Sequence, residues 1–242
     1  MEYTIFIPSY NRAGEISTLE LFPEAVIVCC ESQEEMYRKA NPKAKFLVCP
    51  DKVQGNIARV RNWILKNSPT DYLIMVDDDI KHIGSYKGAK HYRLNAEERE
   101  RMILSGFEMM EDLGTVLWGL NQNADRQNYD EYQPISFKSV VLGVFMGIKR
   151  VPGIYFDERL PLKEDYDYSI QVLNKYRKLL RFNMYHYEAL HLTNEGGCTS
   201  YRSYDRELEQ LQKFQKKWGK EIVRFNTAKS LNPTVKVLIK GV

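Results

Sequence analysis

The sequence predicts an α/β protein with a mostly parallel central sheet, and three observations support that fold class. Residues 1–80 alternate between apolar, strand-like runs and stretches with helical periodicity, as strand–helix–strand units do. Polar segments follow the predicted strands, at the sheet edge where such folds bind ligands. Hydrophobic residues make up 43% of the 242 residues and charged residues 28%, which is the composition of an ordinary globular domain.

Short apolar runs predict four strands in the first part of the chain, over residues 3–8, 25–30, 45–50 and 72–76. Amphipathic stretches predict three helices between them, over residues 15–21, 32–42 and 56–68. Ser32 is expected to cap the second helix, because a serine hydroxyl accepts a hydrogen bond from a free N–H of the first turn. Ile57, Val60 and Ile64 recur at a spacing that places them on one face of the third helix.

The second half of the sequence is less regular. Helices are predicted over residues 95–114, 164–176 and 204–219, and strands over residues 115–120, 139–150, 179–190 and 233–242. Asn95 suits the cap position of the first of these helices. Gly143 and Gly147 interrupt a predicted strand, which often marks close approach by a ligand or another segment. The polar stretch 121–134 is long for a loop, and such loops are often functional.

Composition excludes several classes of protein. The formal net charge is +3, far from the strongly basic character of a dedicated nucleic-acid binder. No apolar run approaches the ~20 residues of a membrane span, and the first residues lack the pattern of a signal peptide. The four cysteines show neither a CxxC spacing nor a zinc pattern. We therefore expect free thiols, a reducing compartment and a cytoplasmic protein.

The stretch YLIMVDDDI, residues 72–80, ends a predicted buried strand in three aspartates. Asp77, Asp78 and Asp79 repel one another, so their burial at a strand end requires a positive partner. Carboxylate oxygens suit Mg²⁺ or Mn²⁺, and these ions often complete their coordination with substrate phosphates. The alternative is a solvated acidic turn before a helix that starts after Ile80.

A basic helix precedes this strand. In QGNIARVRNW, Gly55 and Asn56 open the helix, and Arg59 and Arg61 follow in its first turns. Free N–H groups at a helix start and nearby guanidinium groups favour an anionic ligand. No GK[ST] sequence follows the glycine, so this is not a P-loop. We expect the basic helix and the acidic strand end to converge on one sheet edge; the alternative is an amphipathic helix with solvated arginines.

A further group of acids and one histidine complete the candidate residues. Glu164, Asp165 and Asp167 stand at the start of a predicted helix, where the helix dipole favours acids. A carboxylate in a cleft can equally serve as a general base. His191 follows a predicted strand and is a candidate ligand, whereas His186 lies within that strand and is expected to be either packed or on the surface.

The order of these motifs resembles one known fold family. IFIPSYNRAGEI, GNIARVRNWIL, YLIMVDDDI and LKEDYDYSIQVL follow one another as in glycosyltransferases of the GT-A fold, where Asp77 and Asp79 would form the DxD motif. SQEEMYRKANP, LWGLNQN, LGVFMGI and TNEGG further resemble the TET-associated glycosyltransferases of bacteriophage DNA-modification systems. The resemblance covers most of the chain, from Thr4 to Tyr201.

This resemblance implies roles for individual residues. The donor would be bound by residues at the strand ends and in the basic helix, namely Pro8, Ser9, Tyr10, Arg12, Glu31, Gly55, Asn56, Arg59, Arg61, Asp77 and Asp78. The metal ion would be bound by Asp79, Asp77 and His191. Glu164 and Asp165 match the acid pair of inverting members, with Asp165 the better candidate base. The nearby Asp167 leaves that assignment open.

The resemblance also implies an organisation and a reaction. Residues 1–242 would form one GT-A domain, with a nucleotide-binding half (1–80), an acceptor and catalytic half (81–203) and a C-terminal helix and tail (204–242). The reaction would be an Mn²⁺- or Mg²⁺-dependent, inverting transfer from a nucleotide sugar, with UDP-glucose the default donor. The acceptor would be a hydroxyl of a modified base such as 5-hydroxymethylcytosine in phage DNA, modified in the host cytoplasm.

Other functions fit parts of the sequence. A GT-A enzyme can use a polysaccharide, lipid-carrier or protein acceptor instead of DNA. A DNA acceptor would give phosphate contacts to Arg126, Lys138, Lys149 and Arg150, and base stacking to Tyr129, Tyr132 and Phe137. Nucleotidyltransferases also use paired aspartates, but PSYNRAGE lacks their glycine-rich basic signature. An inactive nucleotide-sugar-binding module is the remaining alternative, against which the intact acids argue.

Overall fold

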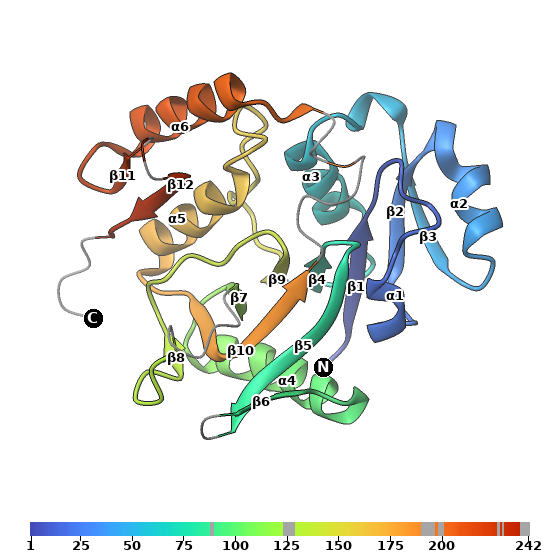
Figure 1. The fold of residues 1–242 in the computed structure, drawn as a ribbon, viewed down its shortest axis with the longest axis horizontal. Helices are drawn as coiled ribbons and strands as arrows, with labels where there is room; N and C mark the ends of the chain where they lie inside the picture. Colours follow the sequence, from blue (N-terminus) through green and yellow to red (C-terminus); the bar gives the residue numbers. More distant parts are fainter. Residues whose placement is uncertain are drawn as a thin grey trace.

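A computed structural model gives the fold and describes residues 1–87, 90–122, 129–189, 197, 201–226, 228 and 230–237. Within these residues, a ten-stranded sheet has the strand order β3-β2-β1-β4-β9-β7-β10-β5-β6, and β8 pairs with β10 (Figure 1). Helices lie on both faces of this sheet. No helix in the described part of the chain is both long and apolar enough to cross a membrane.

The first four strands of the sheet are parallel, as the alternating pattern predicts. They are β1 (Tyr3–Pro8), β2 (Val26–Cys30), β3 (Lys45–Cys49) and β4 (Tyr72–Val76). The helices between them are α1 (Thr18–Leu21), α2 (Glu34–Ala40) and α3 (Ile57–Asn67). Short 3₁₀ turns, η1 (Glu31–Gln33) and η2 (Asp51–Val53), follow β2 and β3. The carboxyl ends of β1 and β4 therefore meet at one edge.

The other strands extend the sheet with mixed directions. They are β5 (Ile80–Lys87), β6 (Lys90–Arg93), β7 (Leu117–Asn121), β8 (Ile135–Ser136), β9 (Phe145–Lys149) and β10 (Leu180–Ala189). Strand β9 runs antiparallel to both β4 and β7, whereas β7 and β10 are parallel. The remaining elements are α4 (Ala96–Asp112), α5 (Glu164–Tyr176), α6 (Tyr204–Trp218), β11 (Val223–Asn226) and β12 (Ser230–Val235). Strands β11 and β12 form a separate small sheet.

Two hydrophobic clusters fix the helices to the two faces of the sheet. On one face, Phe107 of α4 packs against the buried Trp118 of β7, with ring centroids 5.5 Å apart. On the other face, α3 and α5 share a cluster that includes Ile64 and Tyr168. Because α3 and α5 lie on the same face, the basic helix and the acidic helix stand next to each other.

Asparagine residues cap two of the helices, whereas the predicted cap Ser32 does not cap its helix. Asn56 accepts hydrogen bonds from the N–H groups of the first turn of α3, and Asn95 forms a capping box at α4. The prediction for Ser32 is wrong, because α2 begins at Glu34 and Ser32 instead binds the Asp51 carboxylate through its N–H (3.0 Å) and its hydroxyl (2.8 Å). That contact ties η1 to η2.

The three aspartates lie between two strands. Strand β4 ends at Val76 and β5 begins at Ile80, so the alternative of a helix after Ile80 is wrong. The Thr18 hydroxyl donates to the Asp77 carbonyl (2.6 Å) and accepts from the Ile80 N–H (3.0 Å). The backbone of the triplet is therefore bound to α1 as well as to the sheet.

Two expectations about the second half need correction. Residues 139–144 are not a strand, since β9 begins only at Phe145. Lys149 and Arg150 do not flank the pocket, because they lie beside the start of β4 and pair with Glu111 (2.8 Å) and Asp71 (2.7 Å). Arg126 lies outside the described residues.

Candidate active site

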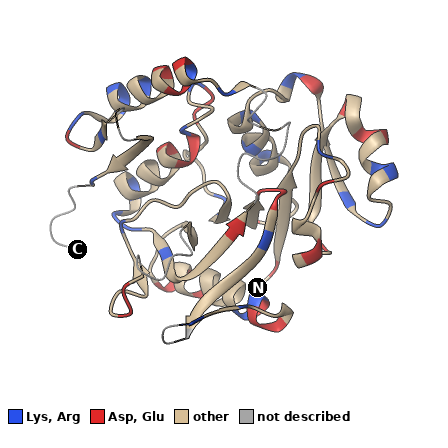
Figure 2. Ribbon diagram, viewed as in Figure 1, with Lys and Arg blue, Asp and Glu red and all other residues tan. Residues whose placement is uncertain are grey.

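A cavity of about 480 Å³ opens at the carboxyl ends of β1 and β4. Figure 2 shows acidic residues at the β4–β5 junction and at the start of α5, and acidic residues from both places line the cavity. The predicted site residues that line this cavity are Pro8, Ser9, Tyr10, Arg12, Gly55, Asn56, Arg61, Asp77, Asp78, Asp79, Glu164 and Asp165. The fold thus brings the three motifs together as expected.

Arg12 is the first positive partner of the aspartates. Its Nη1 lies 2.9 Å from Asp78 Oδ1 and 3.9 Å from Asp79 Oδ2. The Ser9 hydroxyl donates to the other oxygen of Asp78 at 2.6 Å and lies 2.8 Å from the Tyr37 hydroxyl. Both oxygens of Asp78 are therefore engaged by β1 and the segment after it.

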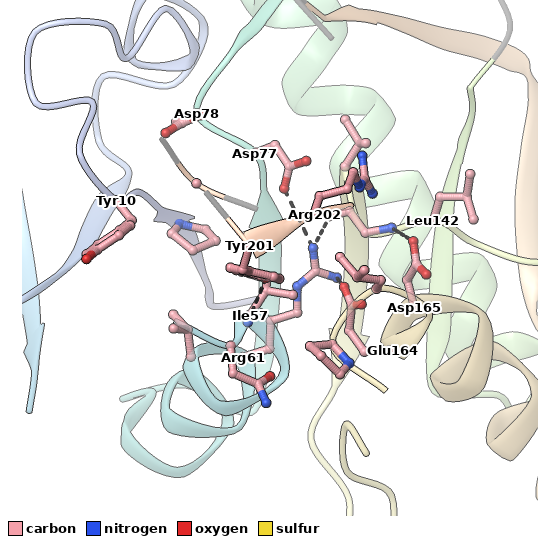
Figure 3. Close-up of a pocket in the computed structure, with 18 of the residues that line it drawn as sticks. Tyr10, Ile57, Arg61, Asp77, Asp78, Leu142, Glu164, Asp165, Tyr201 and Arg202 are labelled. Carbon is pink, nitrogen blue, oxygen red and sulfur yellow. Dashed lines mark hydrogen bonds and ion pairs between the residues drawn. The ribbon is translucent and has the colours of Figure 1, made fainter. Parts of the chain in front are cut away.

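Arg61 is the second positive partner, and it joins the two acidic groups (Figure 3). Only 3% of its side chain is exposed; Nη2 lies 3.6 Å from Asp77 Oδ1, and Nη1 lies 3.7 Å from Glu164 Oε1. It also donates to the Gly143 carbonyl at 3.0 Å. Gly143 is needed there, because a Cβ on it would lie 2.3 Å from Arg61 Nη2.

Negative charge is only partly compensated in this pocket. Desolvation raises the pKa of Asp77 to about 7; Arg61 opposes the shift, while Asp79, Asp78 and Asp165 add to it. Desolvation likewise raises the pKa of Glu164 to about 8, with repulsion from Asp165 as the next cause. The Asp77 side chain is 37% exposed, and it lines the pocket.

Asp165 and Asp167 occupy different environments. Asp165 lines the cavity, and its two oxygens accept the N–H groups of Gly143 (2.9 Å) and Tyr166 (2.7 Å). Asp167 is fully buried outside the cavity lining and is bound by Trp218, Lys217 and Gln171, each at 2.7 Å. Asp167 therefore connects α5 to α6 and does not face the pocket.

Comparison with known proteins agrees with this geometry. A model of the TET-associated glycosyltransferase family matches residues 3–197. The chain belongs to this family. The matched residues include both acidic groups of the family member and Arg61, whereas α6 and the β11–β12 sheet lie beyond them.

Relatives of this TET-associated glycosyltransferase are known from sequence and structure. The β-glucosyl-HMC-α-glucosyl-transferase of enterobacteria phage T6 is 40% identical over 77 residues, which are 30% of this chain and only 27% of that relative. Mannosyltransferase PcManGT from Pyrobaculum calidifontis, solved with GDP-mannose and Mn²⁺, has a TM-score of 0.57 at 14% identity over 89% of this chain and 64% of its own. Glucosyl-3-phosphoglycerate synthase from Mycobacterium tuberculosis, solved with Mn²⁺ and UDP, has a TM-score of 0.52 at 10% identity, covering 97% and 86%. These similarities confirm the GT-A fold.

Some predicted residues of the family member lie elsewhere. Glu31 is exposed in η1, and Arg59 donates to the carbonyls of Lys52 (2.8 Å) and Gln54 (3.3 Å); neither lines the cavity. His191 falls outside the described residues. Within the part of the chain that the structure describes, no three His, Cys, Asp or Glu side chains form a ready metal site.

The sequence did not point to several residues that line the cavity. They include Lys163, Tyr187 and Asn232. Tyr201 and Arg202 also line the cavity, and they end the TNEGGCTSYR segment, whose glycines predict a flexible turn. Arg202 and Asn232 come from beyond the family match, and their contribution depends on how α6 and β12 pack against α5.

The raised pKa values of Asp77 and Glu164 predict a specific pH dependence of stability. In each case the folded protein holds the proton more tightly than the unfolded chain, so stability falls as pH rises toward the folded pKa. His186, whose pKa burial lowers to about 4, adds stability as pH rises, but only up to about 6.5. Between pH 6.5 and 8, we therefore expect the unfolding temperature of the ligand-free protein to fall.

Thermal unfolding across this pH range checks that expectation. Glu164→Gln should flatten the decline, whereas substitution of the exposed Glu35 by Gln should leave it unchanged. An unfolding temperature that stays level or rises from pH 6.5 to 8 contradicts the assignment of raised pKa values.

Proposed function

We propose that this chain is a glycosyltransferase that moves a sugar from a nucleotide sugar, UDP-glucose by first choice, to a hydroxyl of a hydroxymethylated pyrimidine in DNA. The proposal depends on one observation: Arg61 lies between Asp77 and Glu164 in the same pocket. Arg61 thus connects the DxD-type triplet to the acid pair at the start of α5. The family match and the named activity of the phage T6 relative support the reaction class and the acceptor.

The donor would lie between β1 and the start of α3. Tyr10, Pro8 and Asn56 line this part of the pocket and offer an aromatic ring, an apolar edge and a helix start. Asp78 is bound on both oxygens by Ser9 and Arg12, so we assign it to fixing the β1 segment. Binding energy from these contacts would orient the anomeric carbon toward the acid pair.

Asp77 and Asp79 fit a divalent cation. Both carboxylates line the pocket. Desolvation is the main cause of the raised pKa of Asp77, and repulsion from Asp79 and Asp78 adds to it; a bound Mn²⁺ or Mg²⁺ would compensate this negative charge. His191 stays a candidate third ligand on the sequence argument. When bound, such an ion supplies Lewis-acid neutralisation of the departing nucleoside diphosphate.

Asp165 is the group we assign to accept the proton. Its carboxylate is held by two backbone N–H groups and can take the proton from the acceptor hydroxyl. The acceptor oxygen then bonds to the anomeric carbon as the bond from that carbon to the diphosphate breaks. Glu164, with a pKa of about 8, is mostly protonated at neutral pH and is the weaker candidate.

A second acceptor follows from the name of the phage T6 relative. That name specifies an α-glucosyl unit added to β-glucosyl-HMC, so a sugar hydroxyl on an already modified base is the competing acceptor. If a general base activates the acceptor for direct displacement at the anomeric carbon, an α-linked donor gives a β-linked product. An α-linked product would contradict the role of Asp165 as a simple base.

Mass spectrometry of modified DNA tests the proposal. Duplexes with cytosine, 5-hydroxymethylcytosine or β-glucosylated 5-hydroxymethylcytosine would be incubated with a panel of nucleotide sugars and Mn²⁺. We expect the mass gain of one sugar on hydroxymethylated DNA and none on unmodified DNA. No gain on either modified duplex with any donor would exclude the proposed acceptor.

Substitution of Asp79 tests the metal assignment. We expect Asp79→Ala to abolish metal-dependent transfer, as chelation of the metal would in the unsubstituted protein. Glu34→Ala is the control, because Glu34 is a partly exposed residue of α2 that pairs with Arg38. This variant should leave transfer intact. Full activity of the Asp79 variant would rule out its metal role.

A further inference from the structure

Four cations line the pocket, and their exposure differs sharply. The exposed fractions of the side chains are 10% for Arg12, 3% for Arg61 and 2% for Lys163, but 40% for Arg202. The first three pair with carboxylates of the protein. Arg12 pairs with Asp78, and Arg61 lies between Asp77 and Glu164. Lys163 pairs with Glu207. Among the described residues that line the pocket, Arg202 is therefore the cation most accessible to a ligand.

Glu207 holds Arg202 in place. It lies in the first turn of α6, and only 9% of its side chain is exposed. One oxygen, Oε1, lies 2.8 Å from Arg202 Nε, and the other, Oε2, lies 2.5 Å from Lys163 Nζ. The contact through Nε is at one edge of the planar guanidinium, so the end between Nη1 and Nη2 can face a second anion.

Lys163 links the same carboxylate to the catalytic pair. It immediately precedes Glu164 and Asp165, it is buried, and it also lines the pocket. One carboxylate with two cations carries a net charge of +1, and this charge faces the cavity. A guanidinium held on one side and open on the other is suited to a phosphate, which it can bind through two N–H groups.

We propose that Arg202 binds the diphosphate of the donor and that Glu207 is its positioning residue, shared with Lys163. This inference rests on the proposed function, since it takes a nucleoside diphosphate as the ligand. It assigns the diphosphate contact to a segment beyond the family match and not to Arg59 or Arg61, which the protein itself engages. It also makes α6 part of the donor site.

Binding of UDP and uridine to the full chain, in the presence of Mg²⁺, separates this role from a general structural one. Arg202→Ala should weaken UDP binding about 10- to 100-fold, as expected for loss of a charged hydrogen-bonding group, and should leave uridine binding unchanged. Glu207→Gln should weaken UDP binding in the same sense. In the double variant, Glu207→Gln should add little to Arg202→Ala, because it acts through the missing guanidinium.

Matched controls make each outcome decisive. Glu209 lies on the same helix and pairs with Lys213, so Glu209→Gln should leave UDP binding unchanged. Glu207→Gln can fail to fold because Lys163 loses its counter-ion. In that case Arg202→Ala, which changes an exposed side chain, still tests the contact with the diphosphate. Equal UDP affinity in wild type and Arg202→Ala, or additive effects in the double variant, overturns the inference. Failure of the wild type to bind UDP would instead count against the proposed function.

Discussion

Replacing Asp165 by asparagine should lower the rate of sugar transfer about 10²- to 10⁴-fold, the range expected for loss of a general base. The amide keeps the size of the carboxylate, but its single oxygen can accept only one of the N–H groups of Gly143 and Tyr166, which the two carboxylate oxygens accept separately. It cannot accept the acceptor proton at neutral pH. UDP affinity should stay within a few-fold of wild type, since we propose that this side chain acts on the acceptor and not on the nucleotide.

Single-turnover transfer and UDP titration together measure this effect. Glu164→Gln tests the competing assignment, in which Glu164 is the general base. Its transfer rate should fall less than that of Asp165→Asn. Asp167→Asn is the matched control on the same helix: because Asp167 binds Trp218 and Lys217, its loss should lower the unfolding temperature and spare transfer per folded molecule. A larger loss for Glu164→Gln than for Asp165→Asn would reverse the roles of the pair.

Gly143→Ala should both destabilise the protein and impair transfer. The new Cβ would lie 2.3 Å from Nη2, 2.4 Å from Nη1 and 2.7 Å from Cζ of Arg61, closer than any real contact allows. Arg61 is buried and held by the Gly143 carbonyl and Met146, so it must leave its position between Asp77 and Glu164. Overpacking of this kind typically costs about 1–3 kcal/mol.

Chemical denaturation gives the change in the free energy of unfolding, and transfer assays give the functional loss. Gly14→Ala is the matched control, because a Cβ at Gly14 meets nothing within 4 Å; it should be close to neutral in both measurements. If Gly143→Ala behaves like Gly14→Ala, Arg61 is not confined as the geometry indicates.

The sequence contains enough local information to predict the fold of residues 1–80. Each of the first four strands is an apolar run bounded by polar residues. Asn56 and Asn95 mark the starts of α3 and α4, which they cap. The convergence of Arg61 on Asp77 was also predictable, because the carboxyl ends of parallel strands share one edge. Local pattern and tertiary structure agree in this half.

Predictions were wrong where contacts between distant residues decide the structure. Ser32 binds Asp51, which is 19 positions away, instead of capping α2. The contact between Lys163 and Glu207 joins residues 44 positions apart, and no spacing rule pairs them. Gly143 was correctly expected to mark a close approach, but the approaching group is the Arg61 side chain.

The anchoring of the Asp77–Asp79 backbone affects how tightly the site can bind. Residues of a mobile loop lose about 1–2 kcal/mol of conformational entropy each when a ligand orders them. Here β4, β5 and the Thr18 hydroxyl already hold both ends of the triplet, so this loss occurs during folding. A donor and a metal ion bound as we propose would therefore meet a preorganised site, and the free energy of their contacts would go into affinity and orientation.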